Sequence, residues 1–509
     1  MTRRQFLASA AALRAWNAGP VRHLLPTVNH HRILLKASFE QPHSKPPILR
    51  VGSRRTTGLR TDTQGFFWAF DVDQLQPSTR YQLQIHNSSG KALSEPWPLQ
   101  TFPAPDATPE RFRLFIYTCA GGHDATRILG TDQPYWVSVQ NRRKMLLAGL
   151  ARQPDAIIAN GDHVYWDLRI GPGPTQLGAS PIAKKLVGEF ERDMPVLGAD
   201  NERKLQLAVS PQIVELYGTL FRSTPVYFLQ DDHDYFENDE ARDTGITFPP
   251  DDFMLRLARA TQRLYYPEFL PDPTRPEVLD ESFGTLRWGR LVEILLYDCR
   301  RHLTLKGPHA GFIPETGEHW LRRRMQESPA RHVVNLPSTP IAWSAGKWGE
   351  WYADLLGPDG KLTTVKPKYF WQEGWRSQHD RLLAACSAMP RIPLFISGDL
   401  HALAHGRIVR NGQADLRRNP VISVLSGPIS TGPRAWPSAW RGTPPRVPTG
   451  LEVEEALAPL ENNGFTIVDF LPERIDFQMF RWKMDQPESL LDDMQPFYRF
   501  SLAGAQPGP

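Results

Sequence analysis

Four short apolar runs, each followed at once by polar residues that can bind metals, constrain the fold of this chain more than any other feature. The runs and the polar clusters after them are 113–117 with 118–122, 156–160 with 161–165, 226–229 with 231–234, and 392–396 with 397–401. Such runs are typical of buried strands, and binding residues of α/β proteins gather where the strands end. Helical patterns between them, at 141–151 and 203–221, would supply crossover connections. We therefore expect an α/β domain with its site at the carboxyl ends of the strands.

The third cluster places three carboxylates and an imidazole in consecutive positions, from Asp231 through Asp232 and His233 to Asp234. Burying these groups without partners would cost several kcal/mol or more. The pattern makes sense if a cation holds at least one carboxylate while His233 faces a reacting group. A solvated acidic turn is the alternative interpretation of this cluster taken alone.

The other clusters offer donors that suit a pair of cations. Asp162 can bridge two metals through its two carboxylate oxygens, and Tyr165 can bind a ferric ion as a phenolate. Further donors are the thiol of Cys119, the carboxylates of Asp232 and Asp399, and the imidazole of His401. Each donor alone has an ordinary explanation, such as a small core residue or a turn. Together, each at a strand end, they predict a metal centre.

A small all-β region precedes these clusters. Residues 32–102 show short apolar runs at 33–35, 66–70 and 81–85, separated by turn residues as in a β-sandwich. Within them Leu75, Pro77, Thr79 and Tyr81 resemble the corner of fibronectin type III-like domains, where a tyrosine hydroxyl bonds to nearby backbone. A proline-rich linker follows at 102–109. The expected division is a signal or disordered tail at 1–26, a fibronectin III-like sandwich at 27–103, and a catalytic domain at 110–509.

Composition excludes several classes of protein. A hydrophobic content of 40% excludes a disordered chain, and a net charge of only +4 identifies no nucleic acid partner. Three cysteines are too few for a disulfide framework and leave at least one thiol for a metal or the core. Beyond the N-terminus, no stretch is long and apolar enough for a transmembrane segment.

The N-terminus resembles a twin-arginine export signal, with Arg3 and Arg4 before an uncharged run at 6–13. Arg14 interrupts this run, and no convincing cleavage site follows Trp16. The interpretation predicts an exported protein, in the periplasm or at the cell surface, whose partner is the export machinery for twin-arginine substrates. The alternative is a disordered basic tail on a cytoplasmic protein.

The order of the motifs resembles that of the PhoD-type alkaline phosphatases, which belong to the calcineurin-like metallophosphoesterase superfamily. The matching motifs are Cys119, Gly-Asp-x-x-Tyr at 161–165, Asp-Asp-His-Asp at 231–234, Asp-Cys-Arg at 298–300 and Gly-Asp-Leu-His at 398–401. The resemblance covers about 32–482, and 315–321 looks like the family's helix that ends in Trp-Leu. It implies a four-layer α/β/β/α metallophosphoesterase domain with a cluster of iron and calcium.

By this resemblance, Cys119, Asp162 and Tyr165 would hold the iron. Asp232 takes the place of a bridging asparagine, and His233 matches the catalytic histidine. The shell is completed by Asp399 and His401. The chain departs from the family at Gln230, where a tryptophan is usual, and in the Trp-rich region before the last helix. Tryptophans 343, 348, 351, 371 and 375 shape either a substrate pocket or the core.

The charges indicate a mechanism for metal-dependent hydrolysis of a phosphate ester. Cations would neutralise the phosphoryl oxygens and supply a metal-bound hydroxide, while His233 would protonate the leaving alkoxide. Arg300 would clamp a phosphoryl oxygen with its planar guanidinium, the alternatives being a salt bridge to Asp298 or a surface role. Asn238 would be a further contact to metal or phosphate.

The predicted function is therefore that of a PhoD-like phosphatase or phosphodiesterase acting on a small-molecule phosphate ester. One alternative is a non-catalytic metal-binding or scaffold protein on the same fold. A nuclease or phospholipase-like diesterase is another, and salt-sensitive binding to DNA or lipid would favour it.

Overall fold

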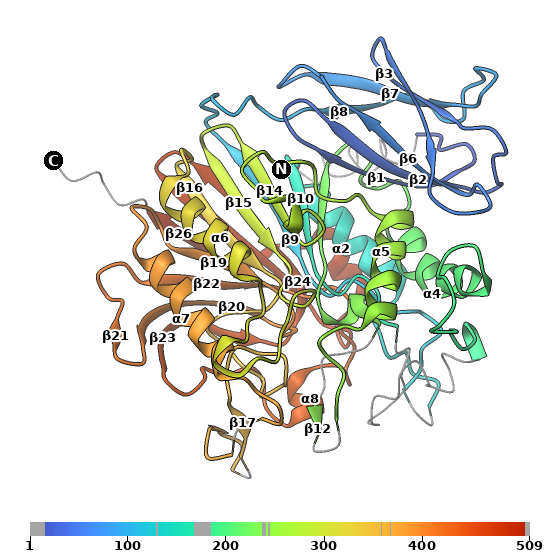
Figure 1. Cartoon of the computed structure of the whole chain (residues 1–509). Helices are drawn as coiled ribbons and strands as arrows, with labels where there is room; N and C mark the ends of the chain where they lie inside the picture. The colour runs from blue at the N-terminus through green and yellow to red at the C-terminus, as the bar shows by residue number, and fades with distance from the viewer. Residues whose placement is uncertain are drawn as a thin grey trace.

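Two large β-sheets face each other at the centre of the protein, with helices on the outer side of each and a strand-rich region at the N-terminal end (Figure 1). The computed structural model describes residues 16–128, 131–166, 185–236, 241–242, 245–357, 359–366 and 368–503. This is the four-layer α/β/β/α architecture preceded by a small β-sandwich that the sequence predicts.

The N-terminal sandwich consists of two four-stranded sheets, ordered β1-β2-β6-β5 and β4-β3-β7-β8. Its strands are β1 (Val21–Val28), β2 (Ile33–Phe39), β3 (Ile48–Val51), β4 (Arg54–Thr57), β5 (Leu59–Arg60), β6 (Phe67–Val72), β7 (Arg80–His86) and β8 (Trp97–Gln100). The Tyr81 hydroxyl accepts a hydrogen bond of 2.8 Å from the backbone N–H of Gln76. Leu75 beside it is buried. The corner therefore has the backbone contact that the sequence predicts.

The first strand begins earlier than the sequence indicates, at Val21, inside the segment 1–26 that we expected to be a signal or a tail. All its residues except Arg22 are buried, so it lacks the alternation that marks a half-exposed strand. The reason is that β1 also contacts the catalytic region, through α4 (Asp200–Tyr217) and β11 (Val226–Leu229). A further helix of that region is contacted as well, since His23 Nε2 lies 2.8 Å from the carbonyl of Tyr265.

The first catalytic sheet has the order β11-β10-β9-β24-β25-β26, in which β9, β10 and β11 run parallel. Its strands are β9 (Phe112–Tyr117), β10 (Ala156–Asn160), β11 (Val226–Leu229), β24 (Asn463–Leu471), β25 (Arg474–Trp482) and β26 (Pro496–Ala503). The helices on this side are α2 (Val139–Leu150), α4 (Asp200–Tyr217) and α5 (Asp252–Tyr265). Helix α2 packs tightly on β9, because a Cβ added at Gly149 would lie 2.3 Å from the Phe115 ring.

The second catalytic sheet has the order β14-β15-β16-β19-β22-β20-β21, with β23 paired to β20. Its strands are β14 (Phe283–Trp288), β15 (Val292–Tyr297), β16 (His332–Pro337), β19 (Leu394–Ser397), β20 (Leu403–Asn411), β21 (Ala414–Asp415), β22 (Val421–Ser426) and β23 (Leu451–Leu460). The helices on this side are α6 (Glu315–Glu327), which includes the predicted helix at 315–321, and α7 (Glu373–Ser387).

Short elements complete the described chain. They are η1 (Asp232–Tyr235), η2 (Glu277–Leu279), η3 (Gly307–His309), η4 (Glu488–Asp493), β12 (Ala241–Arg242), β13 (Gly245–Ile246), β17 (Leu355–Leu356), β18 (Leu362–Thr363) and α8 (Pro437–Arg441). None of the helices in the described ranges combines the length and apolar character needed to cross a membrane. The three cysteines are buried and form no disulfide.

The two catalytic sheets share a buried apolar core, and their edges meet where the predicted clusters lie. Ile116 and Ile158 from the first sheet and Ile294 and Ile396 from the second belong to one buried cluster. The backbone N–H of Thr118, just after β9, donates to the Gly427 carbonyl after β22 at 3.1 Å. This contact brings the ends of β9, β10 and β11 next to the end of β19.

Candidate metal centre and active site

The predicted ligands come together at this meeting of strand ends. Cys119 follows β9, Asp162 follows β10, Asp232 opens η1 after β11, and Asp399 and His401 follow β19. Ligand atoms lie within 4.8 Å of one another in each of three groups: Cys119, Asp162 and His401; Asp162, Asp232 and His233; and Asp231, Asp232 and Asp399. Asp162 and Asp232 each belong to two of these groups, so the three groups form one continuous cluster.

The backbone at four of these residues has a left-handed conformation. The φ angles are 47° at Cys119, 57° at Asp162, 62° at Asp399 and 48° at His401. Residues other than glycine adopt such angles at a cost of about 1–3 kcal/mol each, and they concentrate at functional sites. Here they turn the chain sharply after β9, β10 and β19, which aims the donor side chains at a common point.

The first half of the site is formed by Cys119, Asp162, Tyr165 and His401. Asp162 Oδ2 lies 3.3 Å from Cys119 Sγ and 3.2 Å from the Tyr165 hydroxyl, which is 3.3 Å from His401 Nε2. Donor atoms about 2.0 Å from a tetrahedral metal are separated by about 3.3 Å, so these spacings suit a single ion. Within the described residues, the buried Asp162 Oδ1 has no hydrogen-bond partner. The group therefore fits a metal ion.

The acidic groups of this half suppress one another's ionisation. Burial and the nearby Asp162 charge raise the pKa of Cys119 and of Tyr165 well above their ordinary values. Burial and the charge of Asp232 likewise raise the pKa of Asp162. A cation at this point would reverse these shifts, because it stabilises thiolate, phenolate and carboxylate together.

The imidazole of His401 directs one ring nitrogen toward the other candidate donors. Its Nδ1 lies 2.9 Å from the carbonyl oxygen of Ala435, which can only accept, so Nδ1 carries the proton. Burial lowers the pKa of His401 to about 4. The ring is therefore neutral near pH 7, and the lone pair of Nε2 faces Tyr165 and the other donors.

Hydrogen bonds from three further residues fix the loops of this half, and the sequence assigned none of these residues an individual role. Asp234 accepts hydrogen bonds from the backbone N–H of Asp162 at 2.9 Å and of His163 at 2.9 Å. Gln212 of α4 accepts from the backbone N–H of Tyr165 at 2.9 Å. Arg142 of α2 is buried and donates to the carbonyls of Ala120 and Gly122, at 2.7 and 2.8 Å. Gln212 and Arg142 lie in ordinary helical patterns that gave no signal.

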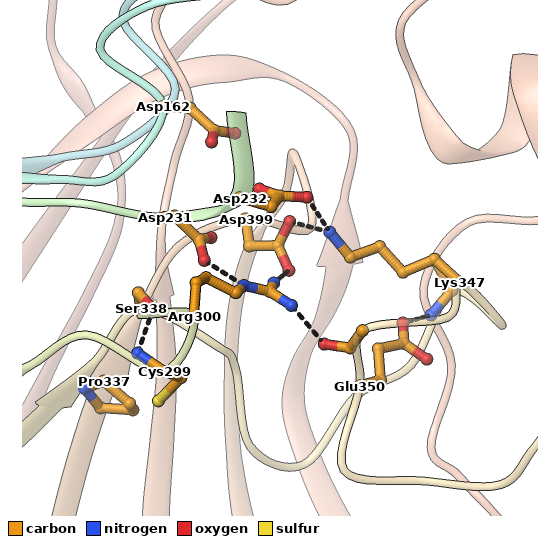
Figure 2. Close-up of polar contacts among 12 residues, drawn as sticks. Asp162, Asp231, Asp232, Cys299, Arg300, Pro337, Ser338, Lys347, Glu350 and Asp399 are labelled. Atoms are coloured by element: carbon orange, nitrogen blue, oxygen red, sulfur yellow. Dashed lines mark hydrogen bonds and ion pairs between the residues drawn. The ribbon is translucent and has the colours of Figure 1, made fainter. Parts of the chain in front are cut away.

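The second half of the site pairs carboxylates with cationic side chains (Figure 2). Lys347 Nζ lies 3.0 Å from Asp232 Oδ2 and 2.5 Å from Asp399 Oδ1. Arg300 Nε lies 2.6 Å from Asp231 Oδ1, and its Nη2 lies 3.3 Å from Asp399 Oδ2. The sequence gave no indication of Lys347.

Arg300 does not occupy the position of a phosphate clamp, contrary to our prediction. Its side chain has 0% exposure, and Nη1 donates to the Gly349 carbonyl at 2.8 Å. The guanidinium is not among the side chains that line the cavity, and it contacts Asp231 and Asp399 instead. Among the described residues no ion pair joins Arg300 to Asp298 either; Asp298 instead accepts a 2.6 Å hydrogen bond from the backbone N–H of Arg300. Asn238, the other predicted substrate contact, lies outside the described residues.

Both halves open into one cavity. His233 lines it, and its ring centroid lies 4.2 Å from that of Tyr165. The remaining walls include Tyr135, Trp136, Lys347, Trp440 and Arg441. Of the five tryptophans considered as pocket residues, Trp343, Trp348, Trp351 and Trp375 are buried and none lines this cavity, so they form core.

Solved structures of phosphatases share this fold. A structure of PhoD aligns with a TM-score of 0.60 at 12% identity, covering 96% of this chain and 91% of that chain. A purple acid phosphatase, PPD1 from yellow lupin (Lupinus luteus) seeds, aligns with a TM-score of 0.54 at 12% identity, covering 96% of this chain and 74% of that chain. The chain therefore has a metallophosphoesterase-type fold.

The sequence profile of the PhoD-like phosphatases narrows this class to one family. It matches residues 142–476, which is more than half of the chain. No curated protein matches the chain significantly. The chain belongs to the PhoD-like phosphatase family, and it is a phosphoric ester hydrolase.

Proposed function

We propose that this protein hydrolyses phosphate esters of small molecules with a metal ion held by Cys119, Asp162, Tyr165 and His401. The observation that carries the proposal is the convergence of these donors, at spacings of 3.2–3.3 Å between neighbouring atoms, beside the orphaned Asp162 Oδ1. Since Asp232 and His233 lie next to Asp162, the same cavity holds a candidate ligand set and a candidate proton donor.

Ferric iron is the ion that this donor set favours. Phenolate and carboxylate oxygens are hard donors that stabilise an oxidised metal, and a thiolate completes an anionic set. When bound, the ion neutralises phosphoryl oxygens and lowers the pKa of a coordinated water. Calcium, which the family resemblance implied, does not fit between Asp232 and Asp399, because Lys347 Nζ already lies 3.0 and 2.5 Å from their oxygens.

His233 is the proposed acid for the leaving group. Its imidazole lines the cavity on the side of Asp162 and Asp232, and its side chain is partly exposed, so it can exchange protons with solvent. Protonation of the departing alkoxide by a positioned histidine is typically worth about 10²–10⁴-fold in rate. Trp136 and Trp440 flank the cavity and would contact the organic group of the ester.

The experiment that tests this proposal combines elemental analysis with hydrolysis of a chromogenic phosphate monoester and a diester, before and after chelation. We expect stoichiometric iron, a visible phenolate-to-iron absorption band, and turnover that the chelator abolishes. Tyr165→Phe should lose the band, whereas Tyr369→Phe, a surface tyrosine outside the site, should keep it. A folded protein that holds no iron and stays inactive after iron is restored would instead support the binding or scaffold alternative.

We also propose that the chain is exported through the twin-arginine route. The support is Arg3 and Arg4 before the uncharged run at 6–13, all of which lie outside the described residues. Fusion of residues 1–30 to a reporter that works only after export tests this directly, with Arg3→Lys and Arg4→Lys together expected to abolish the signal.

A further inference from the structure

Lys347 occupies the place between two carboxylates where a second metal ion would bind. Its Nζ lies 3.0 Å from Asp232 Oδ2 and 2.5 Å from Asp399 Oδ1 (Figure 2). These are the two residues that the family resemblance assigned to the metal shell besides the iron ligands and His401. The side chain also lines the cavity, with 12% of its surface exposed, so it faces both the carboxylates and any bound ester.

The loop that carries Lys347 is anchored by buried polar contacts. Glu350 accepts from the backbone N–H of Ala345 at 2.7 Å and from the Ser344 hydroxyl at 2.5 Å. It also pairs with Lys368 at 2.7 Å, with both side chains buried. These contacts lie on both sides of Lys347 in the sequence and fix the path of its backbone.

A second anchor ties the same loop to the carboxylates. Arg300 donates to the Gly349 carbonyl at 2.8 Å while it contacts Asp231 and Asp399. The guanidinium therefore links the Lys347 loop to the acidic residues that Lys347 approaches. Several independent contacts therefore position the Lys347 ammonium group at the site.

An ammonium group and a divalent ion cannot share this position. Calcium requires oxygen ligands at about 2.3–2.6 Å, and it would have to lie close to the point that Nζ occupies between Asp232 and Asp399. Both cations would also repel each other at so short a distance. A lysine, in contrast, is a compact point charge that commonly binds phosphate.

We propose that Lys347 replaces the second metal ion: the enzyme binds one metal per chain, and the Lys347 ammonium contacts the phosphoryl oxygens that a second ion would contact. The role toward the ester rests on the proposed function. The predicted number of metal ions does not rest on the proposed function, so each part of the proposal can fail separately.

The first test counts metal ions in the full-length protein after equilibration with iron and calcium and removal of free ions. We expect one iron and no stoichiometric calcium per chain in the wild type and in Lys347→Arg, which retains a cation. Lys347→Gln should gain one calcium per chain, because Asp232 and Asp399 lose their ammonium partner. Lys144→Gln, at a partly exposed lysine of α2 outside the cavity, is the matched control. It should bind the same metal ions per chain as the wild type does.

The metal count has clear outcomes. Two metal ions per chain in the wild type would overturn the proposal, and so would a Lys347→Gln protein that is folded by circular dichroism yet gains none. If Lys347→Gln does not fold, the wild-type count decides alone. A wild type with one ion and no hydrolytic activity would sustain the metal replacement while it refutes the proposed function.

The second test measures binding of inorganic phosphate to the iron-loaded protein with calcium removed. Hydrogen bonds to charged groups are worth about 1.5–3 kcal/mol, so Lys347→Gln should weaken phosphate binding by about 10- to 100-fold. Lys347→Arg should recover part of this loss. Unchanged phosphate binding in Lys347→Gln would show that the ammonium does not contact the phosphoryl group.

Discussion

The two halves of the site differ in how the negative charge of their buried acidic groups can be balanced. In the first half Cys119, Asp162 and Tyr165 contact one another, and burial together with the neighbouring acidic groups raises the pKa of all three. Burial also raises the pKa of Asp231 and Asp399 in the second half, but there Arg300 and Lys347 oppose the shift. In the second half Asp231, Asp232 and Asp399 already contact the cationic side chains of Arg300 and Lys347 (Figure 2).

This difference teaches that clustered carboxylates do not by themselves predict the number of metal ions. The partners of each carboxylate decide whether an ion is required. The donors of the first half are acids and a neutral histidine, so full ionisation of these acids would need an ion from solution. In the second half lysine and arginine come from the chain itself, and the charge they add is fixed by folding.

The largest effect should follow from a substitution in the first half. We expect Asp162→Asn to lose its metal and to lower kcat by roughly 1000-fold or more, because it removes a central ligand and with it the electrostatic stabilisation. Metal content and single-turnover rates measure this. Asp106→Asn, the same change in the exposed linker, should leave both unaltered. Retention of full metal content by Asp162→Asn would contradict the assignment of this residue as a ligand.

His233, which lines the cavity beside both halves, should give the next largest effect. His233→Gln should keep its metal and lower kcat by about 10²–10⁴-fold for esters with poor leaving groups such as simple alcohols. The loss should be much smaller for an ester with an acidic phenol as leaving group, which departs without a proton. A loss of equal size for both kinds of ester would mean that His233 is not the leaving-group acid.

A substitution behind the second half should affect stability more than substrate binding. Arg300→Met would leave buried carboxylates without a partner, so the free energy of unfolding should fall by about 3–5 kcal/mol while KM changes little. Urea unfolding and steady-state kinetics measure the two quantities. Arg474→Met, which removes an exposed ion pair, should cost less than about 1 kcal/mol. Unchanged stability with a strongly raised KM would restore the phosphate-clamp interpretation.

The strand ends and their donors could be predicted from the sequence because their signals are local. An apolar run followed by Cys119, Asp162 or Asp399 marks both a buried strand and the place where it ends. The four-layer fold followed from the same runs together with the family resemblance.

Lys347 could not be predicted, because its role depends on a long loop rather than on a strand. It is 115 residues from Asp232 in the sequence, and its position depends on the buried contacts of Glu350. The sequence singled out Arg300, because it follows β15, but it did not indicate which way the side chain points. Whether a guanidinium faces the cavity or lies behind it is decided by tertiary contacts such as the Gly349 carbonyl.

The β1 strand has a practical consequence for anyone who wishes to shorten this protein. Residues of the sandwich such as Leu24 and Leu35 belong to the same buried cluster as Ile116 and Ile294 between the catalytic sheets. The Tyr227 hydroxyl of β11 donates to the carbonyl of Val28. A fragment that began after the linker would therefore expose this apolar surface to solvent, which favours aggregation. The sandwich acts as a permanent cover for the catalytic sheet rather than as a detachable accessory, and truncation should be avoided in expression trials.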